Sequence, residues 1–355
     1  MDDARVRVRE RLSAQMLAGA PARDPLAVVE RLLAVQGQDG RGARLAIRAR
    51  SKGLTAADVD RALTHDRSLV ITWLNRGTLH LVRSEDYPWL QALTTPALSV
   101  GNARRLRQEG VSEPQAELGV RTIHRALEAD GPLTRSELRE RVADAGVPTE
   151  RQAMIHILFL ASLRGLIVRG PMVGAQHAYV LTADWLGSVP AVDPERALAE
   201  LARRYLAGHG PASDRDLARW SGLPVGRARV GLRSIGAELK ERSDGLVDLS
   251  ARPRPAAMPG PKLLGAFDPL LLGWTSREPI LGTAAHLVTS NGVFRPFALI
   301  DGRAVATWGF PGGEVTVEPF RELTPDEGAA LDRDARDVRR FLSPSGPPPT
   351  QRRAL

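Results

Sequence analysis

The sequence contains no cysteine. This absence excludes disulfides, thiolate nucleophiles, iron–sulfur clusters and zinc sites built from cysteine. Lysine is also scarce, because it occurs only at Lys52, Lys240 and Lys262. An enzyme that forms a Schiff base with a sugar needs an amine. Few positions can supply one here, and none of the three lysines is near the candidate site described below in sequence.

Long apolar runs and several familiar motifs are missing as well. No window approaches the roughly 18 consecutive apolar residues of a membrane helix, and the first residues, Met1 to Arg5, are charged rather than typical of a signal peptide. HExxH, P-loop and GxGxxG patterns are absent, and no two histidines stand four residues apart. Metal hydrolysis and nucleotide binding therefore lack support. We expect a cytoplasmic monomer that needs no cofactor and binds no membrane.

Positive charge is abundant and is carried almost entirely by arginine. Lys and Arg together number 49 against 41 Asp and Glu, which gives a formal net charge of +8. A basic surface attracts phosphate and releases counterions, and the planar guanidinium suits phosphate and guanine contacts. The composition predicts a nucleic-acid partner. A GC-rich genome would produce the same arginine bias and is the alternative explanation.

The N-terminal quarter of the chain is predicted to be helical to about Leu63, followed by a hairpin. Asp24 before Pro25 is typical of a helix N-cap, and Thr55 with Asp58 resembles a capping box. The run 69–82 is rich in β-branched and aromatic residues around an Asn-Arg-Gly turn, as in a β-hairpin. This order predicts a wing after a helical cluster.

An internal repeat predicts two further winged helices. The octapeptides 131–138 and 210–217 are similar at an offset of 79 residues, and Thr134 and Ser213 are expected to cap the second helix of each unit. In the earlier unit, a helix over 149–163 precedes two strands around 170–174. That helix is apolar on nearly every face, which is typical of a core helix rather than of a DNA-reading helix.

The remaining chain is predicted to be mostly β. A proline-rich linker covers 251–262, short β-type runs fill 263–317 as a small barrel or sheet, and a charged helix over 324–342 precedes a proline-rich, mobile tail. The fold class is therefore α+β. We place the domain boundaries as follows: 1–98, 99–187, 188–252 and 263–355.

The triplet Gln36-Gly37-Gln38 is the most distinctive polar feature. It is expected to close an apolar helix over 26–35, directly before an arginine-rich helix that forms a basic patch and contains Arg41, Arg44, Arg48 and Arg50. Two neutral amides can donate and accept hydrogen bonds, so together they can hold one water without adding charge. The alternative is that they only terminate a helix. Asp39 is expected to be a solvent-facing carboxylate at a helix end, and electrostatic stabilisation of a reacting cation is the alternative role.

Four segments together resemble a known family. They are AVVERLLAVQGQ (27–38), WLNRGTLHLV (73–82), GAFDPLLLGWTSRE (265–278) and NGVFRPFALIDGRAVATW (291–308). The chain is similar over roughly residues 5–342 to the AlkZ-like DNA glycosylases of the HTH_42 winged-helix superfamily. The catalytic signature of that family is a pair of glutamines separated by one residue, which corresponds to Gln36 and Gln38. The separating residue is usually aliphatic, whereas this chain has Gly37.

The resemblance implies a fold and a chemistry. It implies three tandem winged helices in a C-shaped arrangement plus a C-terminal β-barrel. It also implies excision of bulky alkylated purines from double-stranded DNA and unhooking of interstrand crosslinks. An N7- or N3-alkylated purine is already cationic, so the enzyme mainly needs to place a water near C1′ without repelling the lesion, as two neutral amides can. Because amines are scarce, we expect a monofunctional hydrolase.

Further residues are candidates for contacts with DNA. The resemblance suggests that Thr78 and His80 line the DNA side of the hairpin, although a structural histidine is the alternative. Arg76 at the turn is suited to phosphate. Asn291 and Arg295 belong to a predicted hairpin that can reach the minor groove, although Asn-Gly is first of all a turn signal. A non-catalytic winged-helix DNA-binding regulator remains the alternative function.

Overall fold

Four helices and a hairpin form the N-terminal part of the computed structural model, which describes residues 3–174, 176–188 and 192–343. Asp24 caps its helix through the Leu26 amide, and Thr55 begins a capping box with Asp58, so both predicted helix starts are confirmed. The predicted hairpin is confirmed as well. The elements are α1 Asp3–Ala14, α2 Pro25–Leu32, α3 Gly40–Arg48, α4 Ala56–Thr64, β2 Leu69–Leu74 and β3 Thr78–Arg83.

The predicted helix over 26–35 is wrong at its end. Helix α2 ends at Leu32, and the next residue, Leu33, has a left-handed φ of 64° that turns the chain out of the helix. Residues Val35–Gln36 then form the short strand β1, which pairs with β3. Tertiary pairing with a strand that lies more than forty residues later overrides the local helical pattern, since Val35 is opposite Leu81.

The next two parts of the chain repeat one order of elements. Thr134 and Ser213 each begin a capping box on the second of the three helices that directly precede a hairpin, Arg135–Asp144 and Asp214–Ser221, as predicted. The predicted helix over 149–163 begins only at Ala153, and it is largely buried, as expected of a core helix. The elements are α5 Tyr87–Thr94, α6 Leu98–Gln108, α7 Glu113–Asp130, α8 Arg135–Asp144, α9 Ala153–Leu163, β4 Ile167–Val173, β5 Gln176–Leu181 and α10 Thr182–Leu186, then α11 Pro194–His209, α12 Asp214–Ser221, α13 Val225–Ser234, η1 Gly236–Glu238, β6 Leu239–Glu241 and β7 Val247–Leu249.

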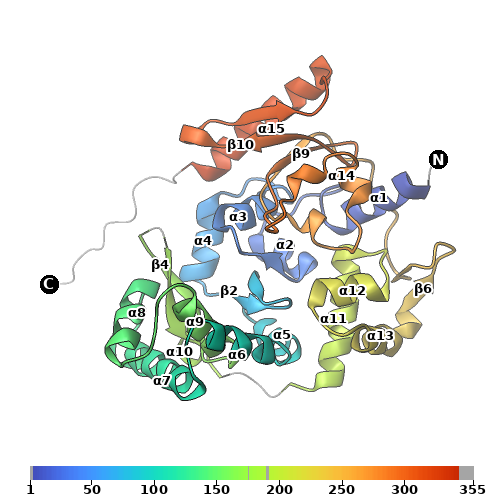
Figure 1. The fold of residues 1–355 in the computed structure, drawn as a ribbon. Coiled ribbons are helices and arrows are strands. Elements are labelled where there is room, and N and C mark those ends of the chain that lie inside the picture. Colours follow the sequence, from blue (N-terminus) through green and yellow to red (C-terminus); the bar gives the residue numbers. More distant parts are fainter. Residues whose placement is uncertain (1–2, 175, 189–191, 344–355) are drawn as a thin grey trace.

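The first two hairpins belong to one sheet. Its strand order is β1-β3-β2-β4-β5, and the two hairpins join where Ile71 of β2 pairs with Arg169 of β4. Figure 1 shows β2 near the centre of the molecule, with β4, α8 and α9 on its left and α11, α12 and α13 on its right. The first hairpin is therefore held between the later parts of the chain.

The C-terminal part is an open sheet rather than the expected β-barrel. Within the described residues it has four strands in the order β11-β10-β9-β8, so β11 and β8 end the sheet instead of meeting. Four short strands are too few to close into a barrel, so the sheet stays open. Helix α15 packs beside β8 and above β10 (Figure 1). The expected proline-rich tail beyond residue 343 lies outside the described residues. The elements are β8 Lys262–Leu264, η2 Pro269–Leu271, α14 Glu278–Leu281, η3 Ala285–Leu287, β9 Phe297–Ile300, β10 Arg303–Gly309, η4 Pro311–Gly313, β11 Thr316–Pro319 and α15 Pro325–Leu342.

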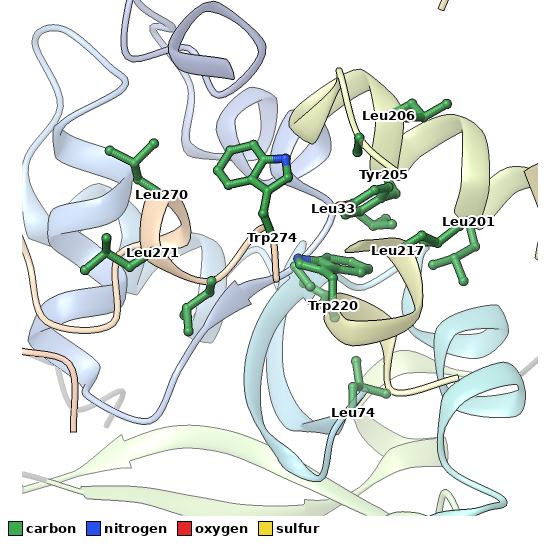
Figure 2. Packing of buried hydrophobic residues seen from close by; sticks show 14 of the residues in the cluster. Leu33, Leu74, Leu201, Tyr205, Leu206, Leu217, Trp220, Leu270, Leu271 and Trp274 are labelled. Carbon is green, nitrogen blue, oxygen red and sulfur yellow. The ribbon is translucent and has the colours of Figure 1, made fainter. Parts of the chain in front are cut away.

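Aromatic packing joins the third group of helices to the segment before α14. Trp220 of α12 and Trp274 are both buried, and His209 packs between their rings and that of Tyr205. Figure 2 shows Trp220 above Leu74, the last residue of β2. The fold thus packs α12 against the turn of the first hairpin.

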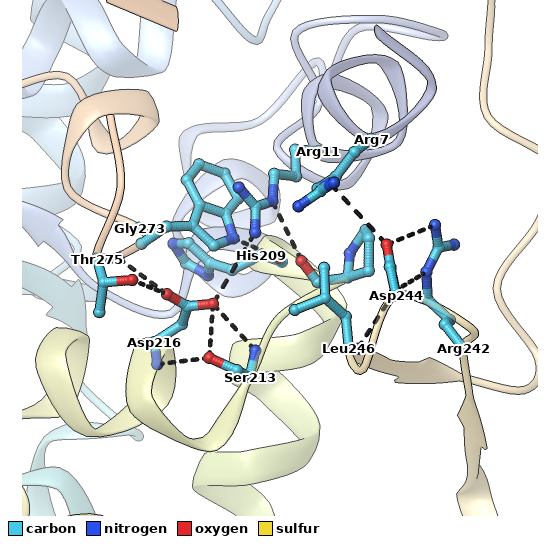
Figure 3. A network of polar contacts seen from close by, with 12 residues as sticks. Arg7, Arg11, His209, Ser213, Asp216, Arg242, Asp244, Leu246, Gly273 and Thr275 are labelled. Carbon is cyan, nitrogen blue, oxygen red and sulfur yellow. Dashed lines mark hydrogen bonds and ion pairs between the residues drawn. The ribbon is translucent and has the colours of Figure 1, made fainter. Parts of the chain in front are cut away.

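A polar network crosses the same junction. Asp216 of α12 accepts hydrogen bonds from the backbone amide and the hydroxyl of Thr275 at 2.9 and 2.7 Å, and Arg11 of α1 lies over the Trp274 ring (Figure 3). Each partner satisfies a buried polar group that would otherwise be costly. The network fixes the Thr275 segment against the start of α12.

Two arginines of the expected basic helix have structural roles. Arg48 is buried and forms ion pairs with Asp334 and Asp337 of α15, and Arg50 is fully buried against Asp268. The predicted helix after the glutamines is present, but Arg48 and Arg50 are buried in ion pairs and do not belong to a basic patch on the surface. Among the described residues no helix is both long and apolar enough to cross a membrane, and no cluster of three or more His, Cys, Asp or Glu could hold a metal ion.

Candidate active site at the first hairpin

Three polar residues form a row across the first hairpin. Gln36 of β1 is paired with His80 of β3, and His80 is paired on its other side with Thr72 of β2. Directly paired residues project from the same face of an antiparallel sheet. The neighbouring row, Val35, Leu81 and Ile71, is buried in the hydrophobic core on the opposite face. The sheet therefore separates an apolar face from a face that bears a polar row.

His80 is neutral in this position. Its Nδ1 lies 2.9 Å from the Thr78 carbonyl oxygen, which identifies Nδ1 as the protonated nitrogen and leaves Nε2 as an acceptor. Burial and, after it, the positive charge of Arg76 lower the pKa of His80 to about 3, against the smaller raising effect of the hydrogen bond to Thr78. The ring therefore adds no charge to the row at neutral pH.

The two glutamines differ in environment. Gln36 is 6% exposed, whereas Gln38 is exposed. A Cβ placed on Gly37 would lie 3.5 Å from the side chain of Ile71 on the apolar face, which is an ordinary contact. An aliphatic residue would thus also fit there. Asp39 caps α3 by accepting from the Gly42 amide, so its carboxylate has a helix-end role, as expected.

Arg76 links the polar row to α12. Its Nη1 donates to the carbonyl oxygens of Arg219 and Trp220 at 3.2 and 2.6 Å, and its Nη2 lies 3.5 Å from Oε1 of Gln36. Burial, followed by the charges of Arg219 and Arg277, lowers the pKa of Arg76 to about 10, so the group stays cationic at neutral pH. The contact favours the orientation in which the Gln36 amide presents its oxygen to Arg76.

Buried polar atoms without partners gather at this hairpin. Within the part of the chain that is described, the hydroxyls of Thr72 and Thr78 have no hydrogen-bond partner, and neither side-chain atom of Asn75 has one. Thr72 and Asn75 are each 1% exposed. Since buried polar groups are normally satisfied, these atoms indicate positions for water or for a bound molecule.

The other predicted site residues lie elsewhere. Arg41 and Arg44 line a groove of about 630 Å³ together with Arg169 of β4, on the face of the sheet opposite the polar row. Arg44 is already paired with Asp60, whereas Arg41 is exposed beside the Phe310 ring.

The predicted hairpin at Asn291 is reduced to a turn closed by one bridge between Val288 and Phe294. Asn291 and Arg295 are exposed there, so the turn is open to a partner. The structure brings Gln36, Arg76, Thr78 and His80 together, and no contact in the described chain connects Asn291 or Arg295 to them.

Sequence analysis missed Thr72, Arg219 and Arg277. Thr72 could have been found from the hairpin register, because the Asn-Arg-Gly turn places it opposite His80. No local pattern signals Arg219 or Arg277, which are distant in sequence from the hairpin. Trp274 and Trp308 are buried, with their indole nitrogens bonded to the carbonyl oxygens of His209 and Leu264, so they are core residues.

Comparisons with known proteins agree with the resemblance seen in the sequence. A family model described as "DNA glycosylase AlkZ-like" matches residues 29–341. The chain is 30% identical over 338 residues to an interstrand DNA cross-link repair glycosylase of Streptomyces sahachiroi, covering 88% of this chain and 89% of that protein. The solved structure of Streptomyces sahachiroi DNA glycosylase AlkZ superposes with a TM-score of 0.77 at 27% identity, covering 95% of this chain and 96% of the other.

Proposed function

The chain belongs to the AlkZ-like DNA glycosylase family, and we propose that it is a monofunctional glycosylase for bulky N7- or N3-alkylated purines in double-stranded DNA. It hydrolyses the N-glycosidic bond with a water held by Gln36 and Gln38. A relative is named for interstrand cross-link repair, so the proposed substrates include crosslinks. The protein acts as a monomer in the cytoplasm.

The polar row carries this proposal. Gln36 pairs with His80, which pairs with Thr72, and all three side chains are uncharged at neutral pH. A neutral row suits a cationic alkylpurine, whose positive charge already weakens the glycosidic bond. What remains is to orient a water toward C1′ as the sugar becomes an oxocarbenium ion, and proximity of this kind lowers the barrier substantially.

Arg76 prepares the Gln36 amide for this role. Because its guanidinium lies 3.5 Å from Oε1, the amide nitrogen is directed away from it. Arg76 is itself anchored to carbonyl oxygens of α12. The glutamine orientation is thereby set before substrate binds, which is the condition for efficient positioning.

A hydrolytic rather than a lyase mechanism fits the placement of the lysines. Burial is the main cause that lowers the pKa of Lys262. The charge of Asp334 raises this pKa, and the charges of Arg48 and Arg50 lower it further. Lys262 lies on β8 and Arg48 on the neighbouring α3, and in the described chain neither forms a hydrogen bond or an ion pair with the polar row. Borohydride reduction should therefore trap no covalent enzyme–DNA adduct.

The proposed engagement of DNA uses the winged-helix units. We propose three units with boundaries at 1–98, 99–187 and 188–252 in a C-shaped arrangement, followed by the C-terminal unit 263–355. The repeated order of helix, capped helix, helix and hairpin supports two of them. Exposed Arg41, Asn291 and Arg295 are the proposed outer contacts.

Single-turnover excision tests the proposal. Gln36→Ala and Gln38→Ala should each slow release of an N7-alkylguanine by roughly tenfold to a thousandfold, with nearly unchanged DNA affinity. The double variant should lose less than the product of the two single effects, because both amides act on one water. Duplexes with N7-methylguanine, a bulkier N7-alkylguanine and a crosslink, cleaved in hot alkali after reaction, rank the substrates.

Glu318→Ala provides the control, since that residue is exposed on β11 and is not among the proposed contacts with DNA. It should leave the maximal excision rate unchanged. Full activity in the double glutamine variant would remove these residues from the mechanism. Wild-type protein that binds all duplexes and excises no base would instead identify a DNA-binding regulator.

A further inference from the structure

Three arginines converge on the turn of the first hairpin. Arg76 lies in that turn, Arg219 is exposed near the end of α12, and Arg277 precedes α14. Arg76 donates directly to the Arg219 carbonyl oxygen at 3.2 Å. A Cβ on Gly222 would lie only 2.8 Å from the carbonyl oxygen of Asn75, so the end of α12 packs tightly against the turn.

The third arginine is fixed to the same junction by the polar network. The Thr275 amide donates to Asp216 of α12 at 2.9 Å, which holds the segment two residues before Arg277 (Figure 3). The Arg277 Nε donates to the Leu271 carbonyl oxygen at 2.8 Å, and the guanidinium lies 4.9 Å from the Phe294 ring centroid. Arg277 is therefore held in one orientation.

The cluster has no counter-charge in the part of the chain that the structure describes. None of the three guanidinium groups forms an ion pair there, and the charges of Arg219 and Arg277 act together with burial to lower the pKa of Arg76. The charge of Arg219 also lowers the pKa of Arg277, after burial as the larger cause. Like charges that are held together without a carboxylate favour binding of an anion.

We propose that Arg219 and Arg277, supported by Arg76, bind a backbone phosphate next to the damaged nucleotide. The Nη1 of Arg76 is committed to carbonyl oxygens of α12, so Arg76 contributes charge and position, and the other two side chains make the contacts. A guanidinium is well suited to bidentate phosphate binding. The placement beside the lesion follows from the 3.5 Å contact between Arg76 and Gln36 and rests on the proposed function.

The bound phosphate has a consequence for the chemistry. The unneutralised guanidinium of Arg76 beside Gln36, reinforced by the charges of Arg219 and Arg277, would oppose the positive charge that develops on the sugar during base release. A bound backbone phosphate carries one negative charge and therefore offsets part of the positive charge of the cluster near that cation. The arginine cluster therefore couples correct placement of the backbone to an electrostatic environment that permits excision.

Binding to a product-like duplex tests the phosphate site without chemistry. The probe is a duplex with a tetrahydrofuran abasic-site analogue, in which single phosphates are replaced in turn by uncharged methylphosphonates. Arg219→Gln and Arg277→Gln should each weaken binding by about tenfold. The double variant should reduce the slope of log affinity against log salt by about 0.9, because one phosphate contact is lost. Arg203→Gln, whose side chain is held by Glu200 and Glu238, is the matched charge control and should change neither.

The methylphosphonate scan places the site. For the wild type, the loss of affinity should be concentrated at a phosphate that flanks the analogue, and the double variant should show no further loss at that position. Equal losses at every position, or equal effects of Arg203→Gln and Arg219→Gln, would overturn the proposal. Arg219 is exposed, so its variant remains informative even if Arg277→Gln folds poorly. Wild-type protein that shows the flanking effect but excises no base would contradict only the proposed enzyme activity.

Discussion

Arg50 and Arg76 are both withdrawn from solvent, but their partners differ. Arg50 is fully buried, and its guanidinium donates to both carboxylate oxygens of Asp268 at 2.8 and 2.9 Å. It also donates to the Gln15 and Ala46 carbonyl oxygens. Arg76 has carbonyl oxygens and the Gln36 amide, with no carboxylate partner within the described chain.

The surroundings of the two arginines differ as well, and this difference is the basis on which the proposed site is distinguished from the packed interior. Arg50 forms an ion pair with Asp268, and Asp216 accepts two hydrogen bonds from Thr275 (Figure 3), whereas Nε2 of the neighbouring His209 is buried without a hydrogen-bond partner in the described chain. Around Arg76, two threonine hydroxyls and the side chain of Asn75 are buried without partners. A buried polar group without a partner lowers stability, so these atoms are positions where a water or a bound molecule would be stabilising.

Breaking the Arg50 pair should have the largest effect on stability. Asp268→Asn leaves Arg50 buried without a counter-charge, and loss of one partner in such a pair costs about 3–5 kcal/mol. Denaturant unfolding followed by far-UV circular dichroism measures this change. Asp214→Asn removes the partner of the more exposed Arg229 and should cost about 1 kcal/mol or less. Equal losses in the two variants would contradict the assignment of Arg50 as structural.

Acid should destabilise both regions through their buried histidines. Burial is the main reason that the pKa values of His80 and His209 both lie at about 3, below the ordinary 6.5. Each histidine is neutral in the folded protein between pH 3 and 6.5, whereas in the unfolded chain it binds a proton below pH 6.5. The free energy of unfolding should therefore fall as the pH falls from 6.5 toward 3, by up to about 1.4 kcal/mol per pH unit for each histidine.

Single substitutions sharpen this comparison between the regions. His80→Gln and His209→Gln should each remove about half of the pH dependence that the two histidines contribute, measured as the slope of unfolding free energy against pH. The excision rate of the wild type should show no titration near pH 6.5, since His80 stays neutral. A rate that follows a group with that pKa would show that His80 is accessible to protons in the active enzyme.

The smallest predicted effect concerns a single hydroxyl. Thr72→Val keeps the side-chain shape and removes an unpaired buried Oγ1, so stability should be unchanged or increased. Excision should fall roughly threefold to tenfold if this hydroxyl contacts the water held by the glutamines. Thr94→Val is the comparison, because its hydroxyl donates to the Leu90 carbonyl and accepts from the Asn75 amide. Thr94→Val should lose about 1 kcal/mol of stability. If Thr72→Val excises the base at the wild-type rate, Thr72 does not belong to the site.

Local chemistry made several features predictable from the sequence. The caps at Asp24, Thr134 and Ser213 depend on a side chain and an amide two or three residues later, so their positions can be found from spacing alone. The hairpin 69–82 follows from strand residues that flank an Asn-Arg-Gly turn. The glutamine pair was found in the same way, from two residues in one short segment.

Tertiary structure decided the features that depend on distant partners. The end of α2 and the strand at Gln36 depend on pairing with β3, and the two hairpins form one sheet because Ile71 meets Arg169. The C-terminal strands formed an open sheet because closure depends on strand number and tilt, which short β-type runs do not specify.

The clearest division concerns arginine. The sequence by itself determined that the protein is basic, that its charge is carried by arginine, and that two amides stand beside that charge. It could not show which arginines were free, because Arg50 meets Asp268 only 218 residues later, whereas Arg76 meets α12 about 143 residues later and finds no carboxylate there. Composition fixes how many charges a chain carries, but only the folded contacts decide which of them are neutralised internally and which remain for DNA.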